Sequence, residues 1–545
     1  MRSENVTSVT ITDGIDCSGD RPAPKRGEVA RSADRPGPGA GEAARASDLL
    51  APGDVTELRA GEAAHGGWCV ARLDGTGPVV FVRHALPGER VRARITEVTA
   101  RFARADAIEI LERSAGRVEP PCPYARPGGC GGCDWQHASL PAQRTLKASV
   151  VRQQLRRIAG IDWPVTVEAL PGDEGTGVHG IAGGPGDDAG DPALDPAGTP
   201  ALDPAGTPAG DPALDPAGDP AGDAPAAGLG WRTRVTFAVR NDGVAGPRAH
   251  RSHEVINIED CLIAHPRIRD LGIPARRWPQ LTTLEAVVAT DNGERAVIAS
   301  GASRSVPLKQ ITAESVLAAV RHRPGGTVLR GHAHLRQRAA GRSWRVSAGG
   351  FWQVHPAAAS TLAGAVLDAL APRPGDTVLD LYCGAGLFAG VLADAVGPGG
   401  TVAGVEASTA AVRDARRNLR PTPWAAVYQG DAGEVIARGV LPPARLAVLD
   451  PPRAGPARDV IDYLATGPGP AGAGNGSGDG PGADDGDTAR RIAYVSCDPA
   501  TLARDVALFA GRGWRLEALR AFDAFPMTHH VECLATLVQG AAPAS

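Results

Sequence analysis

The sequence predicts an α/β protein whose C-terminal domain is a doubly wound, Rossmann-like parallel sheet. From Pro374 onward, short apolar runs alternate with glycine turns and helical patterns, which is typical of parallel strands joined by crossover helices. Residues 53–113 instead contain short alternating runs separated by glycine turns, which predict a small β-barrel. Between them, residues 114–345 mix strand and loop patterns around a group of cysteines, so we expect a mixed α+β central domain. The C-terminal domain then covers 346–545.

The N-terminal residues carry no sign of a targeting or membrane segment. The first 52 residues mix proline, glycine, alanine, aspartate and arginine without the apolar stretch of a signal peptide. No run of about 18 apolar residues, the length that spans a membrane, occurs in the sequence. A chain of 545 residues can bury a large core in roughly two to four domains without disulfides. We expect a cytoplasmic protein with a disordered tail at 1–52, and neither a membrane nor an obligate protein partner.

Two internal segments, 171–228 and 466–488, are predicted to be disordered inserts. The first contains six Asp-Pro-Ala units and almost no apolar side chain larger than leucine, so it cannot bury enough surface to offset its ordering entropy. The second is rich in glycine and aspartate and interrupts the C-terminal domain.

The charge of the remaining chain favours a polyanionic partner. The formal net charge is −4, but outside the inserts the chain holds all 57 basic residues and only 46 of the 61 acidic ones. Of the basic residues 54 are arginine, whose planar head pairs with phosphates and stacks on bases. The folded part of the chain therefore suits binding to RNA.

Three cysteines lie within twelve residues in the motif CPYARPGGCGGC, at Cys122, Cys130 and Cys133. The glycines between them let the chain wrap closely around a small group. Three thiolates do not complete a four-coordinate site, and Cys261 is the best fourth candidate because the other cysteines fall in the tail, the barrel or the last domain. Thiolates suit both zinc and iron–sulfur clusters, and the spacing leaves both open.

A nucleotide-cofactor site is predicted at the start of the C-terminal domain. The stretch TVLDLYCGAG indicates a strand that ends in a glycine turn before a helix, and a second strand, 401–405, ends at Glu406. An acid at that position can accept hydrogen bonds from both ribose hydroxyls. The turn also fits the G-x-G-x-x-A pattern of nicotinamide dinucleotide sites, with an acid 20 residues later. Asp380, which precedes the turn, and the motifs downstream favour S-adenosylmethionine instead.

Two more strands end at the same edge of the predicted sheet. The stretch LAVLDPPRAG ends in Asp450, which two prolines hold in place beside Arg453, and the stretch RIAYVSCDPA ends in Cys497. A thiol that faces a methyl donor suits methylation of a weakly nucleophilic carbon such as C5 of uracil. Addition of a thiolate to C6 makes C5 nucleophilic, and a base later removes the C5 proton.

Glu532 is the candidate base, because it stands in an otherwise apolar final strand where desolvation would raise its pKa toward the useful range. The alternative is an edge-strand glutamate that faces water. For Cys497 we expect an exposed position where the start of the following helix stabilises the thiolate; the alternative is an inert buried thiol.

The motifs CPYARPGGCGGCDWQH, FWQVH, LDLYCGAG, VLDPPRAG, SCDP and HHVE together closely resemble those of the S-adenosylmethionine-dependent RNA (uracil-5-)-methyltransferases, over residues 53–545 outside the inserts. Residues 53–113 resemble the TRAM domain, an OB-like RNA-binding barrel. The resemblance implies methyl transfer to C5 of a specific uridine through a covalent adduct of Cys497 with C6, with Glu532 as the base. It favours 23S rRNA as the substrate, with tRNA as the alternative.

The resemblance also implies a [4Fe-4S] cluster on the four cysteines, and residues that contact S-adenosylmethionine. These residues are Gln353, Tyr382, Glu406, Asp431 and Asp450. Three features depart from the family pattern. Leu387 stands where close relatives have asparagine, His355 replaces the asparagine of the FxQVN motif, and the cysteine spacing is two residues wider.

Other functions compete with this interpretation. A cytosine-5 methyltransferase would carry a Pro-Cys loop where this chain has Pro-Pro-Arg, and an amino-group methyltransferase would carry an aromatic residue after Pro-Pro and no thiol. A non-catalytic iron–sulfur RNA-binding protein with a degenerate methyltransferase domain is an alternative from another class, which Leu387 mildly favours. A dinucleotide-dependent oxidoreductase is a third.

Overall fold

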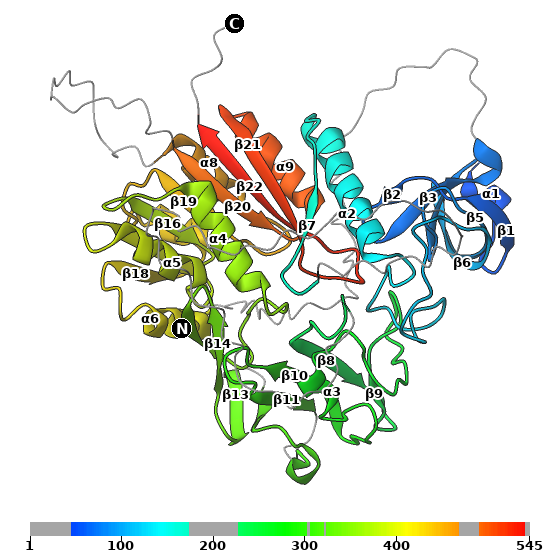
Figure 1. Cartoon of the computed structure of the whole chain (residues 1–545), viewed down its shortest axis with the longest axis horizontal. Helices are drawn as coiled ribbons and strands as arrows, with labels where there is room; N and C mark the ends of the chain where they lie inside the picture. The colour runs from blue at the N-terminus through cyan, green and yellow to red at the C-terminus, as the bar shows by residue number, and fades with distance from the viewer. Residues whose placement is uncertain (1–44, 174–226, 302–305, 321–322, 468–489, 540–545) are drawn as a thin grey trace, which may run out of the picture.

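The computed structural model describes residues 45–173, 227–301, 306–320, 323–467 and 490–539 (Figure 1). The three segments predicted to be disordered lie mostly outside these residues. Their margins at residues 45–52, 171–173, 227–228 and 466–467 are among the described residues. A short helix, α1 (Ala46–Leu49), lies within the first of these margins, and Asp173, within the second, is buried and pairs with His355.

The N-terminal β-domain is a single six-stranded sheet in the order β1-β5-β6-β4-β3-β2. Most neighbours are antiparallel, but β4 and β6 run parallel. Alternate residues such as Val80, Val82 and Val91 are fully buried, which gives the sheet one apolar face and confirms the predicted small β-domain. The strands are β1 (Val55–Arg59), β2 (Ala63–Ala64), β3 (Trp68–Arg72), β4 (Val79–Arg83), β5 (Arg90–Val98) and β6 (Phe102–Glu112).

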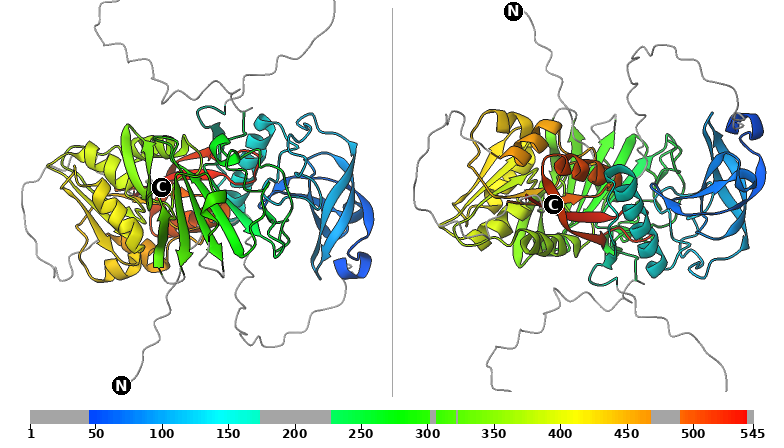
Figure 2. Two further views of the ribbon diagram at one scale, coloured as in Figure 1. Left: turned by 90° about the horizontal axis from the view of Figure 1, so that it is seen from below. Right: turned by 90° about the horizontal axis from the view of Figure 1, so that it is seen from above.

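The central domain is built on a second six-stranded sheet, in the order β13-β12-β11-β10-β8-β9, and a hairpin of β14 and β15. Its elements are β8 (Arg234–Val239), β9 (Ala245–Gly246), α3 (Pro266–Arg269), β10 (Leu281–Val288), β11 (Arg295–Gly301), β12 (Ser315–Val320), β13 (Arg323–Arg330), β14 (His334–Ala339) and β15 (Arg342–Ser347). Seen from below in the left view of Figure 2, this domain (green) lies in front of the red strands of the C-terminal sheet, with the N-terminal β-domain (blue) to the right.

The C-terminal domain is an eight-stranded sheet in the order β18-β17-β16-β19-β20-β22-β21-β7 (Figure 1). The first five strands in this order, from β18 through β17, β16 and β19 to β20, run parallel to one another, whereas β22 is antiparallel to both of its neighbours. The strands are β16 (Thr377–Leu381), β17 (Thr401–Glu406), β18 (Ala425–Gln429), β19 (Leu446–Leu449), β20 (Arg491–Ser496), β21 (Trp514–Asp523) and β22 (Glu532–Gln539). This topology confirms the predicted doubly wound sheet.

Helices cover both faces of this sheet, so its central strands are buried on both sides. One apolar core contains side chains of α4 (Ala358–Leu370), α5 (Leu387–Val396) and α6 (Thr409–Asn418). The other contains side chains of α7 (Ala432–Ala437), α8 (Arg458–Thr466) and α9 (Pro499–Ala510). Burial on both faces explains why these strands are continuous apolar runs rather than alternating ones.

One part of the chain before residue 345 belongs in space to the C-terminal domain. Helix α2 (Leu140–Gln154), which continues into a π-helical turn, packs against α9, and β7 (Val167–Ala169) joins the edge of the sheet parallel to β21. These segments, which the sequence assigned to the central domain, therefore extend the C-terminal domain in space. Within the residues that the structure describes, no helix is long and apolar enough to cross a membrane.

Candidate active site

The direction of chain progression reverses between β16 and β19, which are neighbours at the centre of the C-terminal sheet. From β16 the chain proceeds outward to β17 and β18, and then returns to β19 and β20 on the other side. Leu381 and Leu449, the last residues of β16 and β19, are paired, and the amide of Asp450 lies 3.4 Å from the carbonyl oxygen of Leu381. In open α/β sheets ligands bind in the crevice at this switch point.

The glycine turn after β16 lies at this crevice. Tyr382 and Gly384 have positive φ angles of 71° and 54°, so the chain turns sharply before α5. A Cβ atom at Gly384 would meet nothing within 4 Å, so the space in front of the turn is open to a ligand.

Glu406, at the end of β17, is fixed across the turn. One carboxylate oxygen accepts a hydrogen bond from the amide of Gly384 at 3.0 Å, and the other accepts one from the amide of Ser408 at 2.7 Å. The side chain is partly exposed, so both oxygens retain lone pairs that ribose hydroxyls can use. The structure thus places this predicted residue at the crevice.

Asp380 lies beneath the turn rather than in the crevice. One of its carboxylate oxygens accepts a hydrogen bond from the amide of Ala389 at 2.7 Å, and the other is buried without a partner among the described residues. Burial raises the pKa of Asp380 to about 8, and the charges of Asp450 and Glu406 contribute to the increase. Asp380 therefore ties β16 to α5 and leaves one acceptor unsatisfied near the site.

The remaining predicted cofactor residues lie in different settings. Asp431 is exposed and caps α7, because its carboxylate accepts a hydrogen bond from the amide of Gly433 at 2.9 Å. Gln353 is buried on the segment that leads to α4. The half-buried phenol of Tyr382 has a pKa that burial and the charge of Asp431 raise. The contacts of these three residues with a cofactor stay predictions.

Two of the three departures from the family pattern, at Leu387 and His355, have structural explanations. Leu387 begins α5 and is buried in the apolar core, so its side chain belongs to the packing of the domain. His355 is buried, stacks on Trp231, and places its Nε2 atom 2.8 Å from the Oδ2 atom of Asp173. This pair ties the segment before α4 to Asp173, at the start of the expected insert.

Cys497 and Glu532 emerge at the same end of the sheet. Ser496, the last residue of β20, is paired with Cys533 in the antiparallel strand β22. Cys497, which follows Ser496, and Glu532, which precedes Cys533, therefore lie together just beyond this pair. β22 lies between β20 and β21, and Glu532 is only 4% exposed, so the alternative of an edge-strand glutamate facing water is wrong.

Burial controls the protonation of both residues. It raises the pKa of Glu532 well above its usual value, which was expected, and the charge of Asp450 adds to this increase while Arg453 opposes it. Burial and the charge of Glu532 raise the pKa of Cys497 to about 12, again against the effect of Arg453. Burial also raises the pKa of Asp450 to about 7. These groups therefore form one electrostatically coupled set at the crevice.

Cys497 is partly exposed, but the expectation that its position stabilises the thiolate is wrong. The main causes are burial and the charge of Glu532, and Asp498, which follows the cysteine, makes a smaller contribution. The carboxylate of Asp498 caps α9 by accepting a hydrogen bond from the amide of Thr501 at 2.8 Å, so a negative charge stands where the helix N-terminus would have favoured a thiolate. The Oδ2 atom of Asp498 also lies 3.4 Å from His65 of the N-terminal β-domain.

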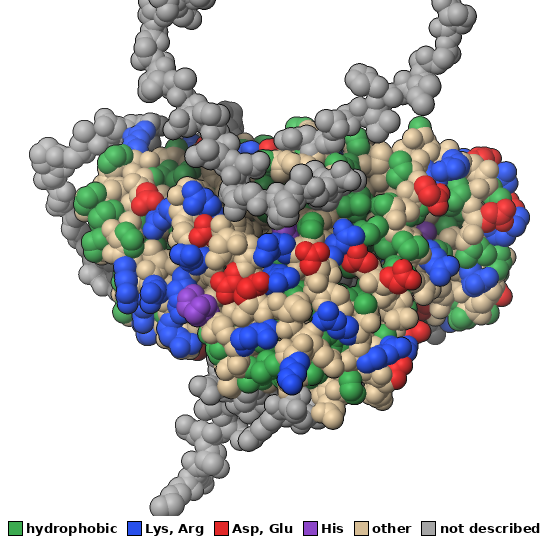
Figure 3. Space-filling view, turned by 60° about the horizontal axis from the view of Figure 1, so that its bottom comes forward, with side chains coloured by type: hydrophobic (Ala, Val, Ile, Leu, Met, Phe, Trp, Pro, Cys, Tyr) green, Lys and Arg blue, Asp and Glu red, His purple; other side chains and the backbone are tan. Residues whose placement is uncertain are grey.

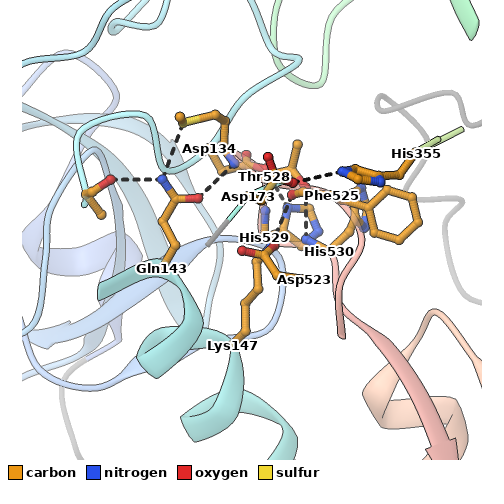
Figure 4. A network of polar contacts seen from close by, with 12 residues as sticks. Asp134, Gln143, Lys147, Asp173, His355, Asp523, Phe525, Thr528, His529 and His530 are labelled. Atoms are coloured by element: carbon orange, nitrogen blue, oxygen red, sulfur yellow. Dashed lines mark hydrogen bonds and ion pairs between the residues drawn. The ribbon is translucent and has the colours of Figure 1, made fainter. Parts of the chain in front are cut away.

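The connection between β21 and β22, residues 524–531, leads directly to Glu532, and we call it the base loop (Figure 4). Its partners lie almost 400 residues earlier: Asp134 contacts His529, Gln143 contacts Met527, and Lys147 contacts Phe525. Sequence reasoning missed these partners. Asp134 and His529 were both inside quoted motifs, but a contact across 395 residues leaves no signal in one sequence.

The four cysteines of the predicted cluster are gathered around one region. The loop at Cys130 pairs with Ala249, and the Tyr124 hydroxyl accepts a hydrogen bond from the amide of Glu259 at 2.9 Å, so the motif and the segment before Cys261 are tied together. Burial raises the pKa of the Cys133 thiol, and Cys130 and Cys261 contribute as neighbouring charges. None of the four cysteines forms a disulfide among the residues that the structure describes. In the described part of the chain, no three such side chains are arranged to hold a single metal ion.

Models of known families match three parts of the chain. The TRAM domain matches residues 53–108, a methyltransferase domain matches residues 372–437, and the tRNA (uracil-5-)-methyltransferase family matches residues 487–539. The last match includes both Cys497 and Glu532.

Relatives match almost the whole chain. An uncharacterized RNA methyltransferase of Streptomyces avermitilis is 45% identical over 88% of this chain and 97% of its own length. A 23S rRNA (uracil(1939)-C(5))-methyltransferase of Shewanella sp. strain MR-4 is 30% identical over 84% of this chain and 90% of its own length. The crystal structure of the Pyrococcus abyssi tRNA (uracil-54, C5)-methyltransferase in complex with S-adenosyl-L-homocysteine covers 88% of this chain and 99% of its own, at 21% identity and a TM-score of 0.58, and shows the same fold.

The switch-point crevice with its glycine turn and acidic strand ends defines a methyltransferase domain, here joined to an RNA-binding TRAM domain. With these relatives, the chain belongs to the S-adenosylmethionine-dependent RNA (uracil-5-)-methyltransferases. The predicted family, fold class and enzyme class are confirmed.

Proposed function

We propose that this enzyme transfers the methyl group of S-adenosylmethionine to C5 of a specific uridine in RNA, with Cys497 as the nucleophile and Glu532 as the base. The observation that carries the proposal is the pairing of Ser496 with Cys533, which brings the thiol and the buried carboxyl to one end of neighbouring strands. Both residues are coupled to Asp450 at the switch-point crevice, where the methyl donor would bind.

The methyl donor would lie across the carboxyl ends of β16, β17 and β19. Glu406 would accept hydrogen bonds from the ribose hydroxyls, because its carboxylate is held in place by two amides and stays partly exposed. Tyr382 and Asp450 would flank the cofactor at the ends of β16 and β19, and Gln353 and Asp431 would complete its pocket.

The reaction then proceeds in four bonding steps. The Cys497 thiolate adds to C6, which forms the S–C6 bond and moves the electron pair of the C5–C6 double bond toward O4. C5 attacks the sulfonium methyl group, so the C5–methyl bond forms and S-adenosylhomocysteine leaves. Glu532 takes the proton from C5, and the S–C6 bond breaks with its electrons returning to sulfur.

Because burial raises the pKa of the Cys497 thiol to about 12, the addition step must include loss of its proton. The proton passes to solvent water, which the partly exposed thiol can reach. Arg453 is the cation that lowers this pKa, and it follows Asp450 and its two prolines at the crevice. We infer that Arg453 helps to stabilise the thiolate when the nucleotide covers the site.

The favoured substrate is 23S rRNA, and tRNA is the alternative. The relative from Shewanella, which matches this chain over most of its length, supports the first, and the fold shared with the Pyrococcus tRNA enzyme supports the second. The target uridine must be in a loop or flipped out of its stack, because a paired base cannot reach a recessed thiol. Lysine and arginine side chains are spread over the face shown in Figure 3, and Arg336 and Arg338 of β14 are well exposed.

We further propose that Cys122, Cys130, Cys133 and Cys261 hold a [4Fe-4S] cluster. The four thiols form no disulfide in the described part of the chain and are gathered in one region, but they are not arranged around a single ion. A cubane cluster spreads its thiolates farther apart than one metal ion does. When bound, the cluster would supply iron–thiolate bonds that hold these loops together. Analysis of the purified protein for iron and acid-labile sulfide tests this assignment, and a protein that contains zinc alone contradicts it.

The direct test of the proposed function is methyl transfer to RNA isolated from a strain that lacks the enzyme. We expect 5-methyluridine at one position of 23S rRNA, measured by nuclease digestion and mass spectrometry. Methylation of another base, or of uridine in tRNA only, would contradict the favoured assignment.

A further inference from the structure

The base loop is held by partners from one short segment of the chain. Lys147 on α2 donates a hydrogen bond to the carbonyl oxygen of Phe525 at 3.0 Å and forms a buried ion pair with Asp523 (Figure 4). The side chain of Gln143, also on α2, accepts a hydrogen bond from the amide of Met527 at 2.7 Å. The amide of Trp135 donates to the carbonyl oxygen of Met527 at 3.0 Å.

A further contact of the base loop, between Asp134 and His529, lies nearest along the chain to Glu532. The Oδ2 atom of Asp134 lies 2.6 Å from the Nδ1 atom of His529 and 3.3 Å from the amide nitrogen of the same residue. One carboxylate thus holds both the side chain and the backbone of His529, three residues before Glu532. Such a two-point contact leaves the loop less freedom than a single hydrogen bond does.

Asp134 also stands where three domains meet. It directly follows Cys133, and its Oδ1 atom lies 3.5 Å from the Nη2 atom of Arg83 in the N-terminal β-domain. A Cβ atom at Gly67, in the turn between β2 and β3, would come within 2.8 Å of Asp134, so only glycine lets this turn approach so closely. Asp134 is itself only 6% exposed.

We propose that Asp134, acting through His529, is a positioning residue for Glu532, so that proton removal from C5 depends on the segment that follows the cysteine motif. The inference rests on the proposed function and names a residue that takes no direct part in the reaction. Asp134 does not touch the uridine, the methyl donor or the thiol in this scheme. It keeps the base loop in the geometry that places the Glu532 carboxyl beside C5.

The consequence is confined to one step. Addition of Cys497 to C6 and methyl transfer do not use Glu532, so both would proceed when the base loop is loosened. The C5 proton would then remain, and the S–C6 bond would not break. A protein–RNA adduct that already carries the methyl group would therefore accumulate.

Three variants test this inference on the full-length protein with RNA and S-adenosylmethionine. Asp134→Asn weakens the contact at its acceptor, and His529→Ala removes the donor on a side chain that is partly exposed, so this variant is the safer one for folding. His529→Asn is the rescue, because the asparagine amide nitrogen can occupy the position of Nδ1 and donate to Asp134. Asp414→Asn is the matched control, since Asp414 is a buried carboxylate that pairs with Arg345 away from the base loop.

We expect the first two variants to lower kcat by roughly tenfold to a hundredfold with KM for RNA unchanged, the size of effect that a small misplacement of a catalytic group produces. Both should accumulate a methyl-labelled protein–RNA adduct on a denaturing gel. His529→Asn should recover most of the rate, and Asp414→Asn should show no adduct.

Normal turnover in Asp134→Asn and His529→Ala, with a wild-type protein that makes 5-methyluridine, would overturn the inference alone. A raised KM with unchanged kcat would also overturn it, because it would make Asp134 an RNA-binding residue. A wild-type protein that methylates no uridine would instead overturn the proposed function.

Discussion

Ser496 and Cys533 face each other across the antiparallel strands β20 and β22, and this one pair sets the geometry of the proposed chemistry. A single register fixes where the thiol of Cys497 and the carboxyl of Glu532 leave the sheet. A shift of one strand by one residue would turn its side chain toward the opposite face and separate the two groups, so the β20–β22 register is as important to catalysis as the side chains themselves.

Replacement of Cys497 by alanine should abolish methyl transfer, because the thiol that adds to C6 is then missing. Affinity for S-adenosylmethionine should not change, since Glu406 and the glycine turn lie on other strands. Incorporation of labelled methyl groups and calorimetric titration measure the two quantities. Methylation at the normal rate would rule out the covalent mechanism.

The change Glu532→Gln keeps the size of the side chain but removes the proton acceptor. Adduct formation and methyl transfer should proceed, and release should be slow, so a denaturing gel should show a protein–RNA band that contains the transferred methyl group. If the variant turns over normally and forms no such band, Glu532 is not the base.

Glu406→Gln should weaken the binding of S-adenosylmethionine. Loss of a charged acceptor of ribose hydrogen bonds costs about 1.5–3 kcal/mol, which corresponds to roughly tenfold to a hundredfold in Kd. The control is Glu517→Gln, because Glu517 is a partly exposed carboxylate that pairs with Arg491 at the opposite end of β20. Equal affinities of the two variants would show that Glu406 does not contact the cofactor.

Asp380 should make the protein less stable as the pH rises. Its pKa is about 8 when folded against a normal value of 3.8, so between these values unfolding releases a proton and the free energy of unfolding falls by about 1.4 kcal/mol per pH unit. Asp380→Asn cannot ionise and keeps an acceptor for the amide of Ala389. The variant should therefore gain stability over the wild type at pH 8 relative to pH 5, as urea unfolding would measure. An equal difference at both pH values would contradict the assigned pKa.

Much of the site could be predicted because its residues follow strands. Glu406, Asp450 and Cys497 each come directly after an apolar run, and parallel strands of one sheet must end at a common edge. The raised pKa of Glu532 could be predicted for the same reason, since a carboxyl in an apolar interior strand is desolvated.

The environment of Cys497 could not be predicted in this way. In the sequence, a strand end followed by a helix start looks the same in two cases. The helix N-terminus can face the thiol of Cys497, or the neighbouring Asp498 can cap it. Only the structure shows that Asp498 takes the cap and that Glu532 comes close from another strand. The charges that set the pKa of the Cys497 thiol are therefore brought near it by the tertiary structure.

The contacts of the base loop and the placement of β7 were missed for a related reason. Neither Lys147 nor Asp134 stands in a local pattern that points to the C-terminal domain, and β7 has only three residues. These contacts join segments separated by more than 370 residues. One sequence without its fold carries no sign of them.

The central claim is a transient bond between the sulfur of Cys497 and C6 of a uridine. RNA in which the target carries 5-fluorouridine tests it most directly, because methyl transfer can occur but a base cannot remove fluorine from C5. The account predicts a stable adduct of the wild-type enzyme that carries one methyl group, with mass spectrometry locating the nucleotide on the peptide that contains Cys497. Methylated RNA without any adduct, or an adduct on a different residue, would contradict it.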